Sequence, residues 1–254
     1  MQCTEKYFEQ DAFRTEAECV ILAAEPDKKT GGGRIVLDGT IFYPEGGGQP
    51  ADVGVLRLPD GSGISVLDVH EHGGVIWHTV DQLPPEAVPG TVVTARLNWQ
   101  WRFDKMQQHT GEHILSGILH QMFGAENVGF HIGSEAVRMD TSVPISAEGL
   151  RRAELAANRI IWQDVPVVIT YPTPEELAQL TYRSKKEIDG QVRIVTIPGA
   201  DVCACCGTHT KTTGQVGQIK ILTSENYKGG VRLSIVCGER ALEAAGHAGA
   251  AGRH

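Results

Sequence analysis

The sequence lacks the segments that direct a chain out of the cell or into a membrane. Its first residues, MQCTEKYFEQDAF, contain no basic stretch followed by an apolar one, which a secretory signal requires. No run approaches the roughly 20 consecutive apolar residues of a membrane-spanning helix. We therefore expect a cytoplasmic protein without a membrane partner.

Cysteine is sparse, and its six residues are scattered except for a cluster at 203–206. Because no secretory signal is present, we expect no disulfide framework, and the cluster indicates metal or redox chemistry instead. An excess of positive charge is also missing, since the net charge is -8. A nucleic-acid partner would therefore have to be bound by a local basic patch.

No tract is polar enough to resist folding, since apolar residues make up 41% and charged residues 21% of the chain. The 254 residues suffice for one large or two small domains, and we expect two.

The glycine triplet Gly46, Gly47 and Gly48 lacks the lysine and the serine or threonine that follow in a phosphate-binding loop. It also lies between expected strands, so no helix N-terminus is available. We therefore expect no nucleotide cofactor. A flexible hairpin loop and a functional loop both remain open for these glycines.

The first hundred residues have the pattern of short strands separated by turn signals such as Asp38-Gly39 and Gly73-Gly74. This spacing predicts a small β-barrel. The expected strands are 34–37, 40–43, 53–58, 64–69, 75–80 and 92–97.

After Asn98, a good N-cap residue, the pattern becomes that of a long helix over 99–123, which Gly124 ends. We place the domain boundary here, with a β-barrel domain over residues 1–97 and a second domain over residues 98–254.

The second domain is expected to be α+β. Thr173-Pro174-Glu175-Glu176 combines an N-cap, a proline at the first helical position and a capping-box glutamate. The final residues, HAGAAGRH, are small, and we expect a frayed end. The other expected elements are a hairpin of 127–133 and 137–143, a helix over 146–163, and strands at 165–171, 192–197, 216–222 and 231–237.

His109 and His113 are four residues apart on the long helix, which puts both imidazoles on one face about one turn apart. The apolar stripe of this helix lies on roughly the opposite side. A solvated polar face would explain an isolated pair, so a partner motif is needed to indicate a metal. His120 is two turns beyond His113 and too far away to share a tetrahedral site with His109.

The same segment, HTGEH, spells the H-x-x-E-H signature of inverzincin peptidases, in which a glutamate, here Glu112, activates water. A zinc metallopeptidase is therefore one alternative. It needs a carboxylate as third ligand, for which Glu175, Glu176 and Glu187 are candidates and none is singled out.

The segment DVCACCGTH, residues 201–209, packs three thiols and an imidazole into a loop expected between two strands. Cys205 and His209 are separated by three residues that include Gly207, so the chain can aim both at one ion. With the helical histidines they make a set typical of zinc rather than magnesium or calcium. Burial as small hydrophobes is the alternative for the cysteines, and Cys203 or Cys206 could donate instead of Cys205.

Together, RFDKMQQHTGEHILS and CACCGTH resemble the editing domain of alanyl-tRNA synthetase and, more closely, the free-standing editing proteins of the AlaX family. TIFYPEGGGQPADVG and KGGVRLSIVCGERAL resemble further parts of that family, so the match spans roughly residues 7 to 242. Longer relatives continue beyond this C-terminus, so the chain is either a medium-length member or a truncation.

The resemblance implies a translation-factor-like N-terminal β-barrel followed by an α+β editing domain that holds one Zn²⁺. It implies a hydrolase that removes serine or glycine from mischarged tRNA-Ala, its partner, and a loop at 46–48 that reaches towards the acceptor end of the tRNA. Many relatives have a small or apolar residue at the position of Glu112, so no role is carried over to it. The family's zinc ligands fall on His109, His113, Cys205 and His209.

From its place on the helical wheel, Glu112 is a candidate general base, with a carboxylate that only supports the ligands or is solvated as the alternative. Thr110 and Gln108 flank the ligands and are candidates for the wall of the substrate pocket. A non-catalytic, zinc-stabilised RNA-binding module is the third functional hypothesis, beside the deacylase and the peptidase.

Overall fold

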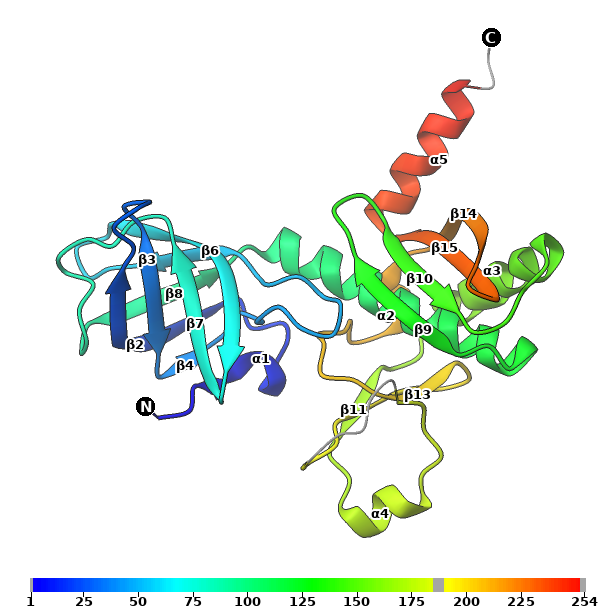
Figure 1. The fold of residues 1–254 in the computed structure, drawn as a ribbon, viewed down its shortest axis with the longest axis horizontal. Coiled ribbons are helices and arrows are strands. Elements are labelled where there is room, and N and C mark those ends of the chain that lie inside the picture. The colour runs from blue at the N-terminus through cyan, green and yellow to red at the C-terminus, as the bar shows by residue number, and fades with distance from the viewer. Residues whose placement is uncertain (1, 185–189, 252–254) are drawn as a thin grey trace. The chain divides into compact units, whose positions relative to one another are not determined.

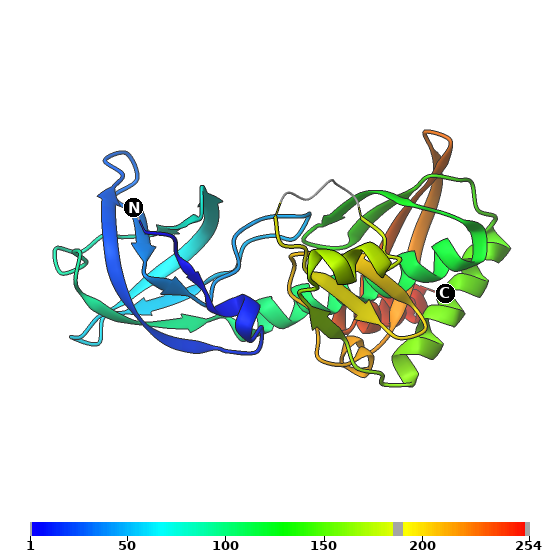
Figure 2. The same cartoon turned by 90° about the horizontal axis from the view of Figure 1, so that it is seen from below.

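The computed structural model describes residues 2–184 and 190–251. The chain divides into two compact units, residues 1–103 and 104–254 (Figures 1 and 2). The sequence placed a boundary between residues 97 and 98, and the structural division follows Phe103, within helix α2 (Trp99–Phe123). In the described part of the chain, no helix combines the length and the apolar character needed to cross a membrane.

The first unit contains a closed six-stranded antiparallel barrel, which confirms the predicted barrel. Its strands neighbour one another in the order β2-β3-β7-β6-β5-β8. Side chains such as Ile21, Ile35, Leu56 and Ile76 fill its interior and are fully buried. The strands are β2 (Glu16–Pro26), β3 (Gly33–Leu37), β5 (Gly54–Arg57), β6 (Gly63–His72), β7 (Val75–Val80) and β8 (Val92–Leu97).

The sequence analysis missed β1 (Glu5–Lys6), α1 (Tyr7–Gln10) and β2. Strand β2 is rich in alanine and glutamate, which have low strand propensity, so its local signal is weak. It pairs with both β3 and β8, and this pairing makes the segment a strand. The strand expected at 40–43 is reduced to β4 (Gly39–Thr40), which pairs with β1.

A buried ion pair fixes the start of α2 within the first unit. The guanidinium of Arg102 is fully buried and donates from Nε to Asp52 at 2.9 Å. Its terminal nitrogens donate to Asp52, to the carbonyl of Ala12 at 2.6 Å and to that of Ile41 at 2.7 Å. Each charge is therefore hydrogen-bonded, as a stable buried pair requires.

In the second unit, α2 and α3 pack with the inner face of the sheet β14-β15-β10-β9 around one apolar core (Figures 1 and 2). A smaller sheet has the order β11-β12-β13. The elements after α2 are β9 (Asn127–Ile132), β10 (Val137–Thr141), α3 (Ala147–Trp162), β11 (Val168–Thr170), α4 (Pro174–Gln179), β12 (Ile194–Ile197), β13 (Asp201–Ala204), the 3-10 helix η1 (Thr213–Val216), β14 (Ile219–Tyr227), β15 (Gly230–Cys237) and α5 (Glu239–Ala251).

The predicted capping box of α4 is confirmed, because Thr173 and Glu176 form it. The structure adds an N-cap for α3, which is Ser146. Three other expectations differ from the structure. The segment 201–204 is a strand instead of a loop, because it pairs with β12, and the strand expected at 216–222 begins only at Ile219. The end expected to be frayed is helical up to Ala251, because α5 is rich in strong helix formers such as alanine and glutamate. Residues 252–254 lie outside the described part.

Candidate metal centre

Helix α2 carries two of the four predicted zinc ligands. Its N-terminus is capped by Asn98, whose side-chain oxygen accepts a hydrogen bond from the backbone of Trp101 at 3.1 Å. His109 and His113 are only 2% and 3% exposed, so the polar face of the helix is buried rather than solvated. The reason is that β13 and the loop after it lie against this face, as the contacts below show.

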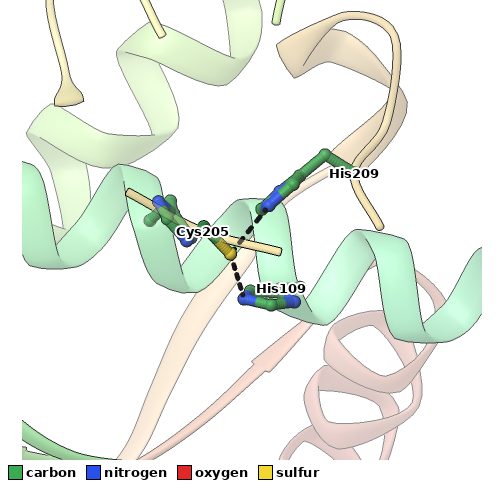
Figure 3. Close-up of side chains that lie close together, drawn as sticks. His109, Cys205 and His209 are labelled. Atoms are coloured by element: carbon green, nitrogen blue, oxygen red, sulfur yellow. Dashed lines mark hydrogen bonds between the residues drawn. The ribbon is translucent and has the colours of Figure 1, made fainter. Parts of the chain in front are cut away.

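Residues 205–209, which follow β13, supply the other two predicted zinc ligands, Cys205 and His209. Within this loop the backbone N–H of Gly207 donates to Cys205 Sγ at 3.3 Å, which fixes the direction of the sulfur. Figure 3 shows His109, Cys205 and His209 pointing towards one another. The possible ligand atoms of His109, His113, Cys205 and His209 all lie within 4.8 Å of one another.

The distances in this group suit a tetrahedral metal. Cys205 Sγ lies 3.4 Å from His109 Nε2 and 3.5 Å from His209 Nε2. Tetrahedral zinc, with bonds of about 2.3 Å to sulfur and about 2.0 Å to nitrogen, would put these atoms about 3.5 Å apart. The group offers three buried imidazoles and one half-buried thiol, which is also a set that zinc prefers. The residues present therefore fit one zinc ion.

The charge states of Cys205 and His209 also suit a metal. Burial opposes ionisation of the Cys205 thiol, but the imidazoles of His109 and His113 hold its pKa well below the ordinary value. Burial lowers the pKa of His209 to about 3, so its imidazole is neutral. A thiolate and a neutral imidazole are the forms that bind zinc. Thr110, which was predicted to line the substrate pocket, has its Oγ1 3.2 Å from His209 Nδ1, whereas Nε2 of the same ring faces Cys205 Sγ.

His113 has an outer partner that the sequence analysis did not single out. Its Nδ1 lies 3.0 Å from Asp201 Oδ2, and Arg183 donates to the same carboxylate. Burial would raise the pKa of Asp201, but the hydrogen bonds from His113 and Arg183 hold it below the ordinary value. For His113, burial lowers the pKa, and Cys205 and Asp201 together raise it well above its usual range.

Arg193 is a second residue that the sequence analysis missed. Its side chain is 6% exposed, and Nη1 donates to the carbonyls of Cys205 at 2.6 Å and Gly207 at 3.0 Å. Its Nε is buried without a hydrogen-bond partner in the described structure. Arg193 therefore holds the ligand loop by its backbone.

Glu112 and Gln108 are both buried. The carboxylate of Glu112 accepts a hydrogen bond from Asn127 and does not belong to the four-residue group. The amide of Gln108 donates to the carbonyl of Cys237 at 2.9 Å and accepts from its N–H at 2.8 Å, which ties α2 to β15. The predicted roles of Glu112 in catalysis and of Gln108 in substrate binding stay predictions.

The alternative cysteine ligands lie outside the four-residue group. Cys203 is buried, and burial raises the pKa of its thiol to about 11. Cys206 is exposed. His120 lies at the surface, 2.9 Å from Glu126, and does not join the group either, as the helical spacing predicted.

The carboxylates considered as a third peptidase ligand are placed elsewhere as far as the structure describes them. Glu176 accepts a hydrogen bond from the backbone of Thr173 at 2.9 Å, as the cap of α4, and Glu175 is exposed on the same turn. Glu187 lies outside the described residues. Among the described residues, no glutamate joins the four-residue group.

The glycine triplet 46–48 lies in the first unit and forms a tight turn. Gly46 and Gln49 exchange two backbone hydrogen bonds of 3.0 and 3.1 Å. Gly47 and Gly48 have φ angles of 59° and 84°, which other residues rarely adopt. The turn explains these glycines locally, and their role towards tRNA stays a prediction.

Two family models match parts of the chain. One, described as the second additional domain of threonyl and alanyl tRNA synthetases, matches residues 192–234, which include Cys205 and His209. The other, described as class II (A) tRNA synthetases, matches residues 5–101.

Several curated proteins match almost the whole chain. The alanyl-tRNA editing protein AlaX-L of Pyrococcus horikoshii is 37% identical over 94% of this chain. The alanine–tRNA ligases of Pyrococcus abyssi and Methanothrix thermoacetophila are 39% and 35% identical, each over 94% of this chain. The chain spans 59% of the length of AlaX-L and 26% of the length of each of these ligases.

Proposed function

Because the chain resembles AlaX-type alanyl-tRNA editing proteins and a part of alanine–tRNA ligases over 94% of its length, we propose that it is an aminoacyl-tRNA deacylase. The substrate proposed is tRNA-Ala that carries serine, or alternatively glycine. One observation carries the proposal: two helical histidines and a Cys-x-x-x-His loop, with His109 and Cys205 96 positions apart in the chain, converge on one point. We propose that this group holds one Zn²⁺.

The ester of an aminoacyl-tRNA is already activated, so the protein mainly has to position a water molecule and stabilise the developing negative charge. Zinc, when bound, supplies a Lewis acid for that task. The residues of the chain build the place for it, with Cys205 as a thiolate and His209 as a neutral imidazole. Glu112, with its carboxylate held by Asn127, remains the candidate for accepting a proton from the attacking water.

The distribution of charge opposes a tRNA partner less in the second unit than in the first. Residues 1–103 contain 15 acidic and 8 basic residues, whereas residues 104–254 contain 16 acidic and 15 basic ones. Most of the net negative charge therefore belongs to the first unit, and the unit with the metal centre is nearly neutral. A nearly neutral unit repels the phosphate backbone much less than the net charge of the whole chain suggests.

The ligand set also favours the deacylase over the peptidase. A peptidase of the H-x-x-E-H type needs a carboxylate as third ligand, whereas the described residues that lie close to both His109 and His113 are Cys205 and His209. Such an enzyme would cleave peptides, require Glu112 and tolerate the loss of Cys205. A non-catalytic RNA-binding module would bind zinc and release no amino acid.

The test is release of the amino acid from Ser-, Gly- and Ala-tRNA-Ala by the full chain. We expect serine or glycine to be released and alanine to be retained. Cys205→Ala should lower the rate on the order of 100-fold or more, because a metal's contribution to such a reaction is worth several kcal/mol. Cys206→Ala changes the exposed neighbour outside the group and should leave the rate unchanged. Equal rates for the two variants would contradict the proposal.

A further inference from the structure

A chain of three side chains runs outward from the metal centre. His113 Nδ1 lies 3.0 Å from Asp201 Oδ2. Arg183 donates from Nε to Asp201 Oδ1 and from Nη2 to Asp201 Oδ2, both at 2.8 Å. The side chains of His113 and Asp201 are 3% and 2% exposed, and that of Arg183 is 13% exposed. The carboxylate is therefore held on two sides and shielded from water.

Arg183 is itself fixed by two elements of the second unit. Its Nη2 also donates to Ser116 Oγ on α2 at 2.7 Å. Its backbone pairs with β13, since its N–H donates to the carbonyl of Val202 at 2.8 Å and its carbonyl accepts from Ala204 at 2.9 Å. The guanidinium fork therefore has one position, and it gives Asp201 one orientation.

This arrangement bears on which nitrogen of His113 carries the proton. A neutral imidazole has one N–H, and the other nitrogen presents a lone pair. A carboxylate accepts hydrogen bonds and cannot donate one when ionised. A proton on Nδ1 therefore satisfies Asp201 and leaves Nε2 as the nitrogen with a free lone pair for a metal.

We propose that Asp201 and Arg183 are positioning residues of the metal centre: Asp201 fixes the tautomer and ring orientation of His113, and Arg183 fixes Asp201. The inference rests on the proposed function only in taking the four-residue group as a zinc site. It goes beyond that function by assigning a role to two residues outside the ligand set.

The second unit contains a matched control. Arg232 forms the same fork with Asp140, from Nε to Oδ1 at 2.7 Å and from Nη2 to Oδ2 at 2.8 Å. Neither residue belongs to the ligand group. An arginine–carboxylate pair outside the ligand group is thus available for comparison in the same chain.

The experiment measures the zinc affinity of the full chain by competition with a chromophoric chelator. Asp201→Asn keeps the size of the side chain and should weaken zinc binding by about 10- to 100-fold. Arg183→Lys keeps the charge but loses the fork, and should weaken it by a smaller factor. Asp140→Asn should leave the affinity unchanged. Circular dichroism of the zinc-loaded variants verifies that each is folded.

Imidazole ¹⁵N NMR separates positioning from a general loss of stability. In the zinc-loaded wild-type chain we expect Nδ1 of His113 to carry the proton and Nε2 to carry none. In zinc-loaded Asp201→Asn we expect the proton to shift from Nδ1 towards Nε2, with no change in zinc-loaded Asp140→Asn. Zinc affinity of Asp201→Asn within about twofold of wild type overturns the inference, as does a wild-type chain that binds no zinc. If the affinities follow the expected order but no amino acid is released from any tRNA, the inference stands and the proposed function fails.

Discussion

The buried histidines of this protein differ in the groups that face their ring nitrogens. His78 lies inside the barrel, with Nε2 2.8 Å from Thr40 Oγ1 and Nδ1 3.0 Å from the carbonyl of Ile35. Burial lowers the pKa of His78 to about 4, so it stays neutral. His209 is also neutral, but its Nε2 faces the sulfur of Cys205. A ring nitrogen that faces a proposed metal ligand, rather than a hydroxyl or a carbonyl group, distinguishes the candidate site histidine from the core histidine.

The depressed pKa of His78 predicts a pH-dependent stability of the first unit. The ordinary pKa of 6.5 applies to the unfolded chain, so between about pH 4 and 6.5 the unfolded chain binds more protons than the folded one. The contribution of His78 is therefore full above pH 6.5 and falls as the pH drops towards 4, by about 3 kcal/mol. Urea denaturation between pH 4 and 8 should show a smaller decrease for His78→Gln than for wild type.

His72→Gln controls for this comparison, because it removes an exposed histidine at the end of β6, the strand that pairs with the strand of His78. Its pH dependence should follow that of the wild-type chain. An unchanged slope in His78→Gln would show that the burial of His78 does not govern the acid sensitivity of the barrel.

At the scale of elements, α2 is packed closely on more than one side, and its glycines mark the closest approaches. A Cβ on Gly117 would lie 2.2 Å from the carbonyl oxygen of Ala200, just before β13. A Cβ on Gly111 would lie 2.2 Å from Cys237 Sγ at the end of β15. The glycines allow these elements to approach the turn of α2 that carries His109 and His113, although glycine weakens a helix by about 1 kcal/mol relative to alanine.

The cost of Gly111→Ala therefore depends on Cys237. In the wild-type chain the added methyl group meets Cys237 Sγ and should destabilise the second unit by about 1–3 kcal/mol. In a Cys237→Ala background the sulfur is gone, and the nearest remaining atoms, the Cβ at position 237 and Val216 Cγ1, lie 3.3 Å from the added methyl group, so the same change should cost less. A double-mutant cycle of unfolding free energies measures this difference. Additive effects of the two substitutions would disprove the contact.

At the scale of the whole molecule, the two units have separate apolar cores with no residue in common. One core consists of described residues between Tyr7 and Leu97, and the other of described residues between Ile114 and Cys237. All four proposed zinc ligands belong to the second unit. A metal bound there would stabilise that unit by mass action.

Removal of the metal should accordingly lower the unfolding temperature of the second unit and leave that of the first unit unchanged. At a zinc concentration of about 1,000 times Kd the stabilisation is about 4 kcal/mol, and a strong chelator abolishes it. Calorimetry should show the shift. Of the four tryptophans, Trp162 belongs to the second unit, whereas Trp77, Trp99 and Trp101 belong to the first. Intrinsic fluorescence of a Trp162→Phe variant should therefore follow the unmoved transition. Cys205→Ala should not respond to the chelator. A chelator effect on the fluorescence transition of Trp162→Phe would contradict the separation.

Local patterns in the sequence were sufficient for much of the fold. The predicted N-caps Asn98 and Thr173 accept hydrogen bonds from backbone groups three residues away. The spacing of turn signals between short strands indicated the barrel. Local patterns also gave the spacing of the proposed ligands, since His109 and His113 lie one helical turn apart and Cys205 and His209 share one loop. Such signals depend on neighbours in the chain, and a sequence displays them directly.

Only the tertiary structure decided which distant groups meet. Strand β2 is a strand because it pairs with β3 and β8, and Asp201 faces His113 across 88 positions of the chain. Arg183 and Arg193 carry no local signal for their contacts with Asp201 and the Cys205 loop. The sequence by itself determined the chemistry of the donors and their local spacing. The packing of α2 against β13 determined their convergence, because burial and long-range pairing depend on the whole chain and not on any one segment.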